Sequence, residues 1–164
     1  MESSTSQTID AQPRISLPRE LVATPVLLLM RLGFEVKGRA IEQFGEEGFT
    51  PFQFGVLALL EEAACGAQAT IADTLGLDRS QLVGLLDSLE ERGLIERRRD
   101  PQDRRRQVVS LTGSGHAVLV RLRAIVSRIQ DDFLEPLDSA DREELYRLLL
   151  RLAQHHDPRC APPE

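Results

Sequence analysis

Seven arginines lie within fifteen residues near the middle of the chain, at positions 92, 97, 98, 99, 104, 105 and 106. The acids between them are Glu96, Asp100 and Asp103, which leaves this segment with a net charge of +4. The whole chain has a formal net charge of -6, so its other residues together carry -10. Because guanidinium groups bind phosphate oxygens through paired hydrogen bonds, the cluster predicts that one face attracts a polyanion. Charge alone leaves a solvated arginine-rich loop as an alternative.

Other residue types that support chemistry are sparse. Cys65 and Cys160 are too few for a disulfide framework and match neither a redox nor a zinc-binding spacing. His155, His156 and Cys160 make a poor metal site, because adjacent helical side chains point about 100° apart and no fourth ligand is evident. His116 is expected to be structural. The sequence contains no nucleophile elbow, phosphate-binding loop or H-E-x-x-H motif, so we expect neither an enzyme nor a bound cofactor or metal.

The composition is that of an ordinary globular protein. Of 164 residues, 41% are apolar and 28% are charged, which is sufficient for a core. Aromatic residues make up only 4% and tryptophan is absent, so a surface that stacks on bases is not expected. No apolar run reaches about 18 residues and the N-terminus lacks a signal-peptide pattern. We therefore expect a cytoplasmic protein that does not contact a membrane.

Local signals predict two helices before the arginine cluster. Residues 1–18 are polar and are expected to form a flexible arm. Thr24 as N-cap, with proline after it, predicts a helix over residues 25–46 whose first half is apolar nearly all round. Such a helix needs a second partner, for example another subunit. A capping box between Thr50 and Gln53 predicts the next helix, to about residue 64.

Two more helices are predicted within residues 68–92, joined by a tight turn. Gly76 can adopt the positive φ of a helix C-terminus, and Asp78 can cap the following helix. Leucines at positions 82, 85, 86 and 89 form one apolar face of that second helix, which ends at Gly93. Small Ala72 allows the two helices to approach closely. This pattern is typical of a helix-turn-helix, although an ordinary helical hairpin is the alternative.

The arginine cluster itself predicts a hairpin. Residues 94–99 form one strand, DPQD forms the turn, and residues 105–112 form the returning strand. Thr112 caps a long helix, and Asp138 or Ser139 caps the last one. The apolar stripe expected on the long helix is Val118, Leu122, Ile125, Val126, Ile129 and Phe133. A helix-turn-helix followed by an arginine-tipped hairpin is a winged helix, so the fold class is mainly α with a small β-wing.

The run GLIERRRDPQDRRRQVVSLTGSG resembles the wing signature of the MarR family of bacterial transcription regulators. The segment before it, IADTLGLDRSQLVGLLDSLEERGL, is similar to the helix-turn-helix pattern of the same family. The resemblance implies a sequence-specific DNA-binding regulator, in which Arg105 enters the minor groove and Asp103 holds the wing arginines in position. The DNA-binding residues it implies are Arg79, Ser80, Gln81, Gly84, Arg98, Arg104, Arg105 and Arg106.

Two positions depart from the family pattern. Gly84 stands where many members carry a basic residue, and Ser88 stands where another arginine is frequent. Residues 78–92 hold four acids and two bases, so this helix is weakly charged for a helix that lies against DNA. We therefore expect more of the affinity to come from the wing than from the helix.

The resemblance also implies a homodimer that binds a palindromic operator and is released by a small aromatic acid or phenolic ligand. The expected organisation is an arm at 1–18, a first dimerisation helix at 19–48, a DNA-binding domain at 49–112, dimerisation helices at 113–156 and a tail at 157–164. The residues expected to line the ligand site are Arg31, Phe34, Phe52 and Arg123. Each of these four residues also has a purely structural alternative, in which the arginines are solvated and the phenylalanines belong to the core.

Two other functions remain open from the sequence. The acidic remainder of the chain would suit a winged helix that binds another protein instead of an operator. A redox-responsive regulator using Cys65 is the second, although this thiol follows the C-terminal end of a helix, where the dipole disfavours a thiolate.

Overall fold

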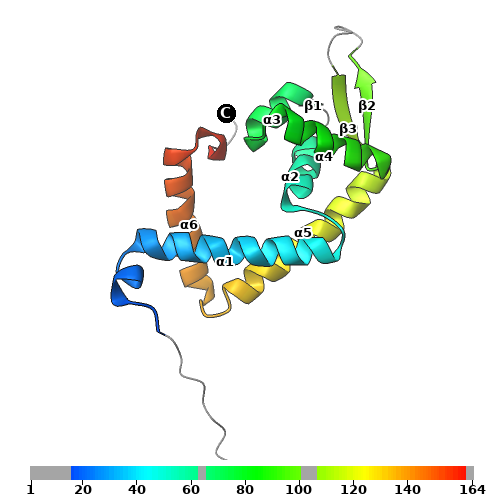
Figure 1. Ribbon diagram of the computed structural model, residues 1–164. Helices are drawn as coiled ribbons and strands as arrows, with labels where there is room; N and C mark the ends of the chain where they lie inside the picture. Colours follow the sequence, from blue (N-terminus) through cyan, green and yellow to red (C-terminus); the bar gives the residue numbers. More distant parts are fainter. Residues whose placement is uncertain (1–15, 63–65, 101–106, 162–164) are drawn as a thin grey trace, which may run out of the picture. The chain divides into compact units, whose positions relative to one another are not determined.

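A computed structural model of the chain describes residues 16–62, 66–100 and 107–161 (Figure 1). The described residues form two compact units, which divide at Glu35 and Val36. The helices are α1 (Pro25–Glu46), α2 (Pro51–Glu62), α3 (Gln68–Leu75), α4 (Arg79–Glu91), α5 (Gly113–Phe133) and α6 (Ser139–His156). The strands are β1 (Gly66–Ala67), β2 (Ile95–Arg99) and β3 (Gln107–Leu111), and short 3-10 turns cover Arg19–Val22 and Pro158–Cys160. The predicted fold class, mainly helical with a small β-wing, is confirmed.

The predicted helix starts are confirmed by their hydrogen bonds. Thr24 Oγ1 accepts a bond from the Leu27 amide at 3.4 Å. Thr50 and Gln53 form the reciprocal capping box, with N–O distances of 2.9 and 3.2 Å. Asp138, rather than Ser139, caps α6. In each case a side-chain oxygen takes one of the amide protons that a helix N-terminus leaves without a partner.

The helix-turn-helix is formed by α3 and α4. Gly76 has φ +64° at the end of α3, so the chain turns there in a conformation that few other residues adopt. Asp78 caps α4 and forms a second capping box with Gln81, which we had not predicted although the D-x-x-Q spacing indicates it. These two positions fix the sharp angle between the helices.

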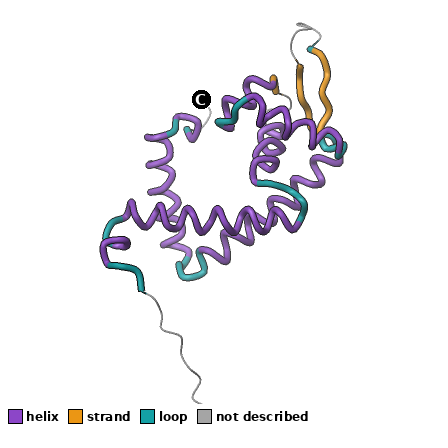
Figure 2. Tube along the Cα trace, in the orientation of Figure 1, coloured by secondary structure: helices purple, strands orange, loops and turns teal. Residues whose placement is uncertain are grey.

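The sheet has three strands in the order β1-β3-β2, all antiparallel (Figure 2). The hairpin of β2 and β3 is the predicted wing, with Ile95 opposite Leu111 and Arg99 opposite Gln107. Strand β1 was not predicted, because two residues are too few to give an alternating pattern. By pairing with Val108 and Val109, it adds a third strand to the sheet.

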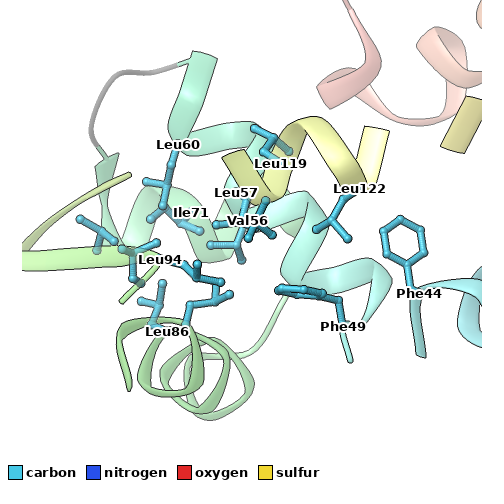
Figure 3. Packing of buried hydrophobic residues seen from close by; sticks show 14 of the residues in the cluster. Phe44, Phe49, Val56, Leu57, Leu60, Ile71, Leu86, Leu94, Leu119 and Leu122 are labelled. Carbon is cyan, nitrogen blue, oxygen red and sulfur yellow. The ribbon is translucent and has the colours of Figure 1, made fainter. Parts of the chain in front are cut away.

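The core lies between α2, α3, α4, α5 and the sheet (Figure 3). Its fully buried side chains include Val56, Leu57, Leu60, Ile71, Leu86, Leu89, Val109, Leu119, Leu122 and Ile125. One part of the predicted α5 stripe was wrong: Val126 is exposed, whereas Leu119 is completely buried. The reason is that the core covers α5 unevenly along its length, and Leu119 lies where α5 packs against α2.

Most of the exposed large apolar side chains in the described residues lie on two helices. In α1 they are Val26, Leu28, Leu29, Met30, Leu32, Phe34 and Ile41. In α6 they are Tyr146, Leu148, Leu149 and Leu152. This much uncovered apolar surface is typical of a face that packs against another molecule. Across the described part of the chain, none of the helices combines the length and apolar character needed to span a bilayer.

Candidate nucleic-acid interface

The N-terminus of α4 presents the three polar residues predicted to face DNA. Arg79, Ser80 and Gln81 are all exposed. Asp78 accepts hydrogen bonds from the Ser80 hydroxyl at 2.7 Å and from the Gln81 amide at 2.8 Å, and these bonds lower the pKa of its carboxyl. The Gln81 side-chain oxygen in turn accepts from the Asp78 amide at 3.3 Å. Ser80 and Gln81 therefore build the cap of α4, while Arg79 next to them is exposed.

The outer face of α4 is the surface that the fold leaves uncovered. Leu82, Leu86 and Leu89 are buried on the inner face, whereas Val83 and Gly84 are exposed. A Cβ atom added at Gly84 would meet no other atom within 4 Å. The outer face is consequently open, and a partner can approach the helix backbone closely at Gly84.

Arg97 connects the wing to α4, a role that sequence patterns did not indicate. Its Nε lies 2.8 Å from a Glu90 carboxylate oxygen, its Nη2 lies 2.6 Å from Asp87, and its backbone amide donates to Glu90 at 3.1 Å. The Arg97 side chain is only 19% exposed. It holds the pKa of Glu90 below its ordinary value, and the two acids raise the pKa of Arg97. Arg97 thus fixes β2 on α4 and offsets two negative charges that would repel a phosphate backbone.

Replacing Arg97 with methionine should lower the free energy of unfolding by about 1–2 kcal/mol, because charge-assisted hydrogen bonds at a largely covered site are lost. The folded-state pKa of Glu90 is depressed, so its stabilising contribution is present above the unfolded pKa of about 4.3 and is lost as the pH falls through the folded value. Chemical denaturation at neutral and acidic pH should show the difference between wild type and variant shrinking in acid.

Arg98 provides the matched control for that experiment. It pairs with Glu96 at 2.9 Å, but its side chain is 75% exposed. An exposed ion pair contributes little, so Arg98→Met should change stability by no more than about 0.5 kcal/mol at any pH. Equal losses for Arg97→Met and Arg98→Met would contradict the structural role of Arg97.

The other described arginines of the cluster are of two kinds, one that contacts the rest of the fold and two that are exposed. Arg92 lies over the Phe49 ring at 3.7 Å and donates to the Gly48 carbonyl at 2.9 Å, so it belongs to the fold. Arg98 and Arg99 are exposed on β2. The predicted wing residues Asp103, Arg104, Arg105 and Arg106 lie outside the described residues. Strands β2 and β3, which flank that segment in the sequence, extend away from α3 and α4 (Figure 2).

The base of the wing is held by a set of short contacts. Gly93 has φ +66°, and its carbonyl accepts from the Thr112 hydroxyl at 2.7 Å. The Leu94 carbonyl accepts from the Thr112 amide at 3.1 Å. A Cβ atom added at Gly115 would lie 2.1 Å from that same carbonyl oxygen, so only glycine fits there. The end of α4, the start of β2 and the start of α5 are therefore locked together.

The four residues predicted to bind a ligand lie on α1, α2 and α5. Arg31 and Phe34 are exposed in the first unit, and Phe52 is exposed on α2. Arg123 forms an ion pair with Glu61, which also lies 3.3 Å from a ring nitrogen of His116. Arg123 first, and then His116, lower the pKa of Glu61. The Arg123 guanidinium thus already has a carboxylate partner in this structure.

The other residues considered for redox or metal chemistry do not assemble into a site. Cys65 lies outside the described residues, and Cys160 is exposed. His155 and His156 have ring centroids 4.9 Å apart in an edge-on arrangement. Within the ranges that the structure describes, no group of three or more histidine, cysteine or acidic side chains is placed to hold a metal ion.

Comparison with known proteins identifies this arrangement. The sequence model of the MarR family matches residues 49–106, from just before α2 to the end of the segment that joins β2 to β3. A transcriptional regulatory protein for the hcr operon of Thauera aromatica is 35% identical over 129 residues, which cover 74% of this chain and 78% of that protein. The chain belongs to the MarR family. The family is one of transcriptional regulators, as the resemblance in the sequence implied.

Solved structures of MarR-family regulators agree in fold. The transcriptional repressor CouR, bound to a 23-mer DNA duplex, is 36% identical and superposes with a TM-score of 0.75, covering 84% of this chain and 99% of that one. The PcaV transcriptional regulator from Streptomyces coelicolor, in complex with its natural ligand, is 32% identical with a TM-score of 0.68, covering 84% of this chain and 96% of that one. MarR-family relatives of this chain therefore include DNA-bound and ligand-bound proteins.

Proposed function

We propose that this MarR-family regulator is a repressor that binds a palindromic operator as a homodimer and is released by a small aromatic or phenolic ligand. In this proposal residues 49–112 bind DNA, residues 19–48 and 113–156 form the dimer, and 1–18 and 157–164 are an arm and a tail. The observation that carries the proposal is the open outer face of α4 beside an arginine-bearing hairpin. An α-helix fits the major groove, and the hairpin can reach the adjacent minor groove.

The proposed DNA contacts follow from exposure and charge. Arg79 and the start of α4 are exposed, and backbone amides at that end favour negatively charged phosphates. Arg98 is exposed on the wing strand, and Arg104, Arg105 and Arg106 follow it with Asp103 as the orienting acid. CouR, which has the same fold, is bound to a DNA duplex. This supports double-stranded DNA as the partner of the winged helix.

The homodimer rests on the exposed apolar side chains of α1 and α6. Phe34 on α1 is 73% exposed and Tyr146 on α6 is 67% exposed, which is unfavourable unless a partner covers them. A two-fold dimer presents two winged helices, so its operator would be palindromic with half-sites about 10 base pairs apart.

The proposed ligand contacts are Arg31, Phe34, Phe52 and Arg123. Arginine binds a carboxylate and phenylalanine covers an aromatic ring. In this structure Glu61 takes the place of such a carboxylate on Arg123. PcaV, with its natural ligand bound, supports a small-molecule effector. Titration of the DNA complex with aromatic acids and phenols, followed by fluorescence anisotropy, tests the release step.

Operator binding should depend steeply on salt. Each phosphate that an arginine neutralises releases counterions, so log K falls by about 0.9 per contact for each log unit of salt. The measurement is a titration of the protein into a DNA fragment from the promoter of its own gene, at several salt concentrations. A scrambled fragment of equal length is the control. A flat salt response would mean that the arginines do not contact phosphates. Equal affinity for both fragments would contradict sequence-specific binding and favour the protein-contact function.

A further inference from the structure

Val83 is an exposed apolar side chain on the helix proposed to enter the major groove. Its relative exposure is 45%, although Leu82 before it and Leu86 after it are buried. The helical period turns position 83 away from the core. An isopropyl group left in water is not stabilised by the fold, so its surface is available to a molecule outside the chain.

Two polar neighbours of Val83 on α4 are already bonded within the chain. Ser80, one turn before it, donates to Asp78 at 2.7 Å. Asp87, one turn after it, accepts from Arg97 at 2.6 Å. Both lie beside Val83, since side chains three and four positions apart are neighbours on a helix. Between Ser80 and Asp87, the side chain exposed on this face is the apolar isopropyl group of Val83.

Gly84, next to Val83, leaves the helix backbone bare. No atom lies within 4 Å of a Cβ built at this position, so the fold does not require a glycine there. Alanine would favour the helix more. The missing side chain instead allows a partner to approach the α4 surface closely beside Val83.

We propose that Val83 determines operator specificity by packing on the C5-methyl group of one thymine in each half-site. That methyl is the apolar group that base pairs expose in the major groove. The occupant is DNA because the adjacent wing strand carries exposed Arg98 and Arg99 and because CouR, at 36% identity, is bound to a duplex. This inference rests on the proposed operator binding.

Deoxyuridine scanning tests the contact, since deoxyuridine differs from thymidine only by the missing methyl. In a promoter fragment that the protein binds, each thymine is replaced in turn and the Kd is measured. We expect that replacing one particular thymine in a half-site raises the Kd about fourfold, and that replacing the equivalent thymine in both half-sites raises it about fifteenfold. For Val83→Ala, the same two replacements should change the Kd less than about twofold, because the side chain that packs on the methyl is gone.

Val120→Ala is the matched control. Val120 is also an exposed valine, at 63%, but it lies on α5 outside the proposed DNA contacts. This variant should keep the full deoxyuridine penalty, and the melting temperatures of both variants show that they fold. Operator binding with no penalty in the wild type, or with the same penalty in Val83→Ala, overturns the thymine contact and leaves the proposed function intact. Failure of the wild type to bind its promoter fragment overturns both.

Discussion

Gly115→Ala is expected to lower the free energy of unfolding by about 3 kcal/mol and the melting temperature by about 10 °C. The new methyl group would lie 2.1 Å from the Leu94 carbonyl oxygen and 2.8 Å from Leu111 Cδ2. The oxygen cannot move aside easily, because it also accepts from the Thr112 amide. Helix α5 and the base of the wing would therefore have to separate. Thermal and chemical denaturation measure the loss.

Gly84→Ala is the control, and its effect should have the opposite sign. Gly84 also lies inside a helix, but the space around it is open. Alanine there should raise stability by about 0.5–1 kcal/mol through helix propensity alone. A Gly115→Ala protein at least as stable as the wild type would show that α5 and the Leu94 carbonyl are not in contact as described.

Arg105→Ala should weaken operator binding about 10- to 100-fold, and more than Arg79→Ala does. A bidentate contact to bases is worth about 1–3 kcal/mol, and an arginine in a narrow minor groove also gains from the negative potential there. Replacing Arg79, which we propose faces a phosphate, should weaken operator binding only a few-fold. Fluorescence anisotropy at fixed salt gives both constants. Arg105→Lys should fall between wild type and Arg105→Ala, since lysine keeps the charge without the planar fork. The reverse ranking of Arg105 and Arg79 would contradict the expectation that the wing supplies most of the affinity.

Features that depend on neighbouring residues were predictable from the sequence. The caps at Thr24, Thr50, Asp78 and Thr112 and the turn at Gly76 all rest on interactions within about four residues. Such interactions leave a recognisable pattern because the spacing along the chain fixes the geometry. The same holds for the hairpin, whose strands are joined by a short segment.

Features that depend on tertiary contact were not predictable. Arg97 looked like any other arginine of the cluster, since its partners Asp87 and Glu90 lie across the junction between a helix and a strand. The pairing of Arg123 with Glu61 joins residues 62 positions apart. Burial of Leu119 instead of Val126 depends on which part of α5 the core reaches. None of these follows from residue type and spacing alone.

The contacts at the wing base have a mechanical consequence. Gly93 and Leu94 join the end of α4 and the start of β2 to Thr112, which begins α5. Arg97 ties the same strand to the C-terminal half of α4. A displacement of the first turn of α5 should therefore move α4 and the strands β2 and β3 with it as one rigid body. In the homodimer proposed above, an effector would act by changing the distance between the two winged helices, while the shape of each stays the same.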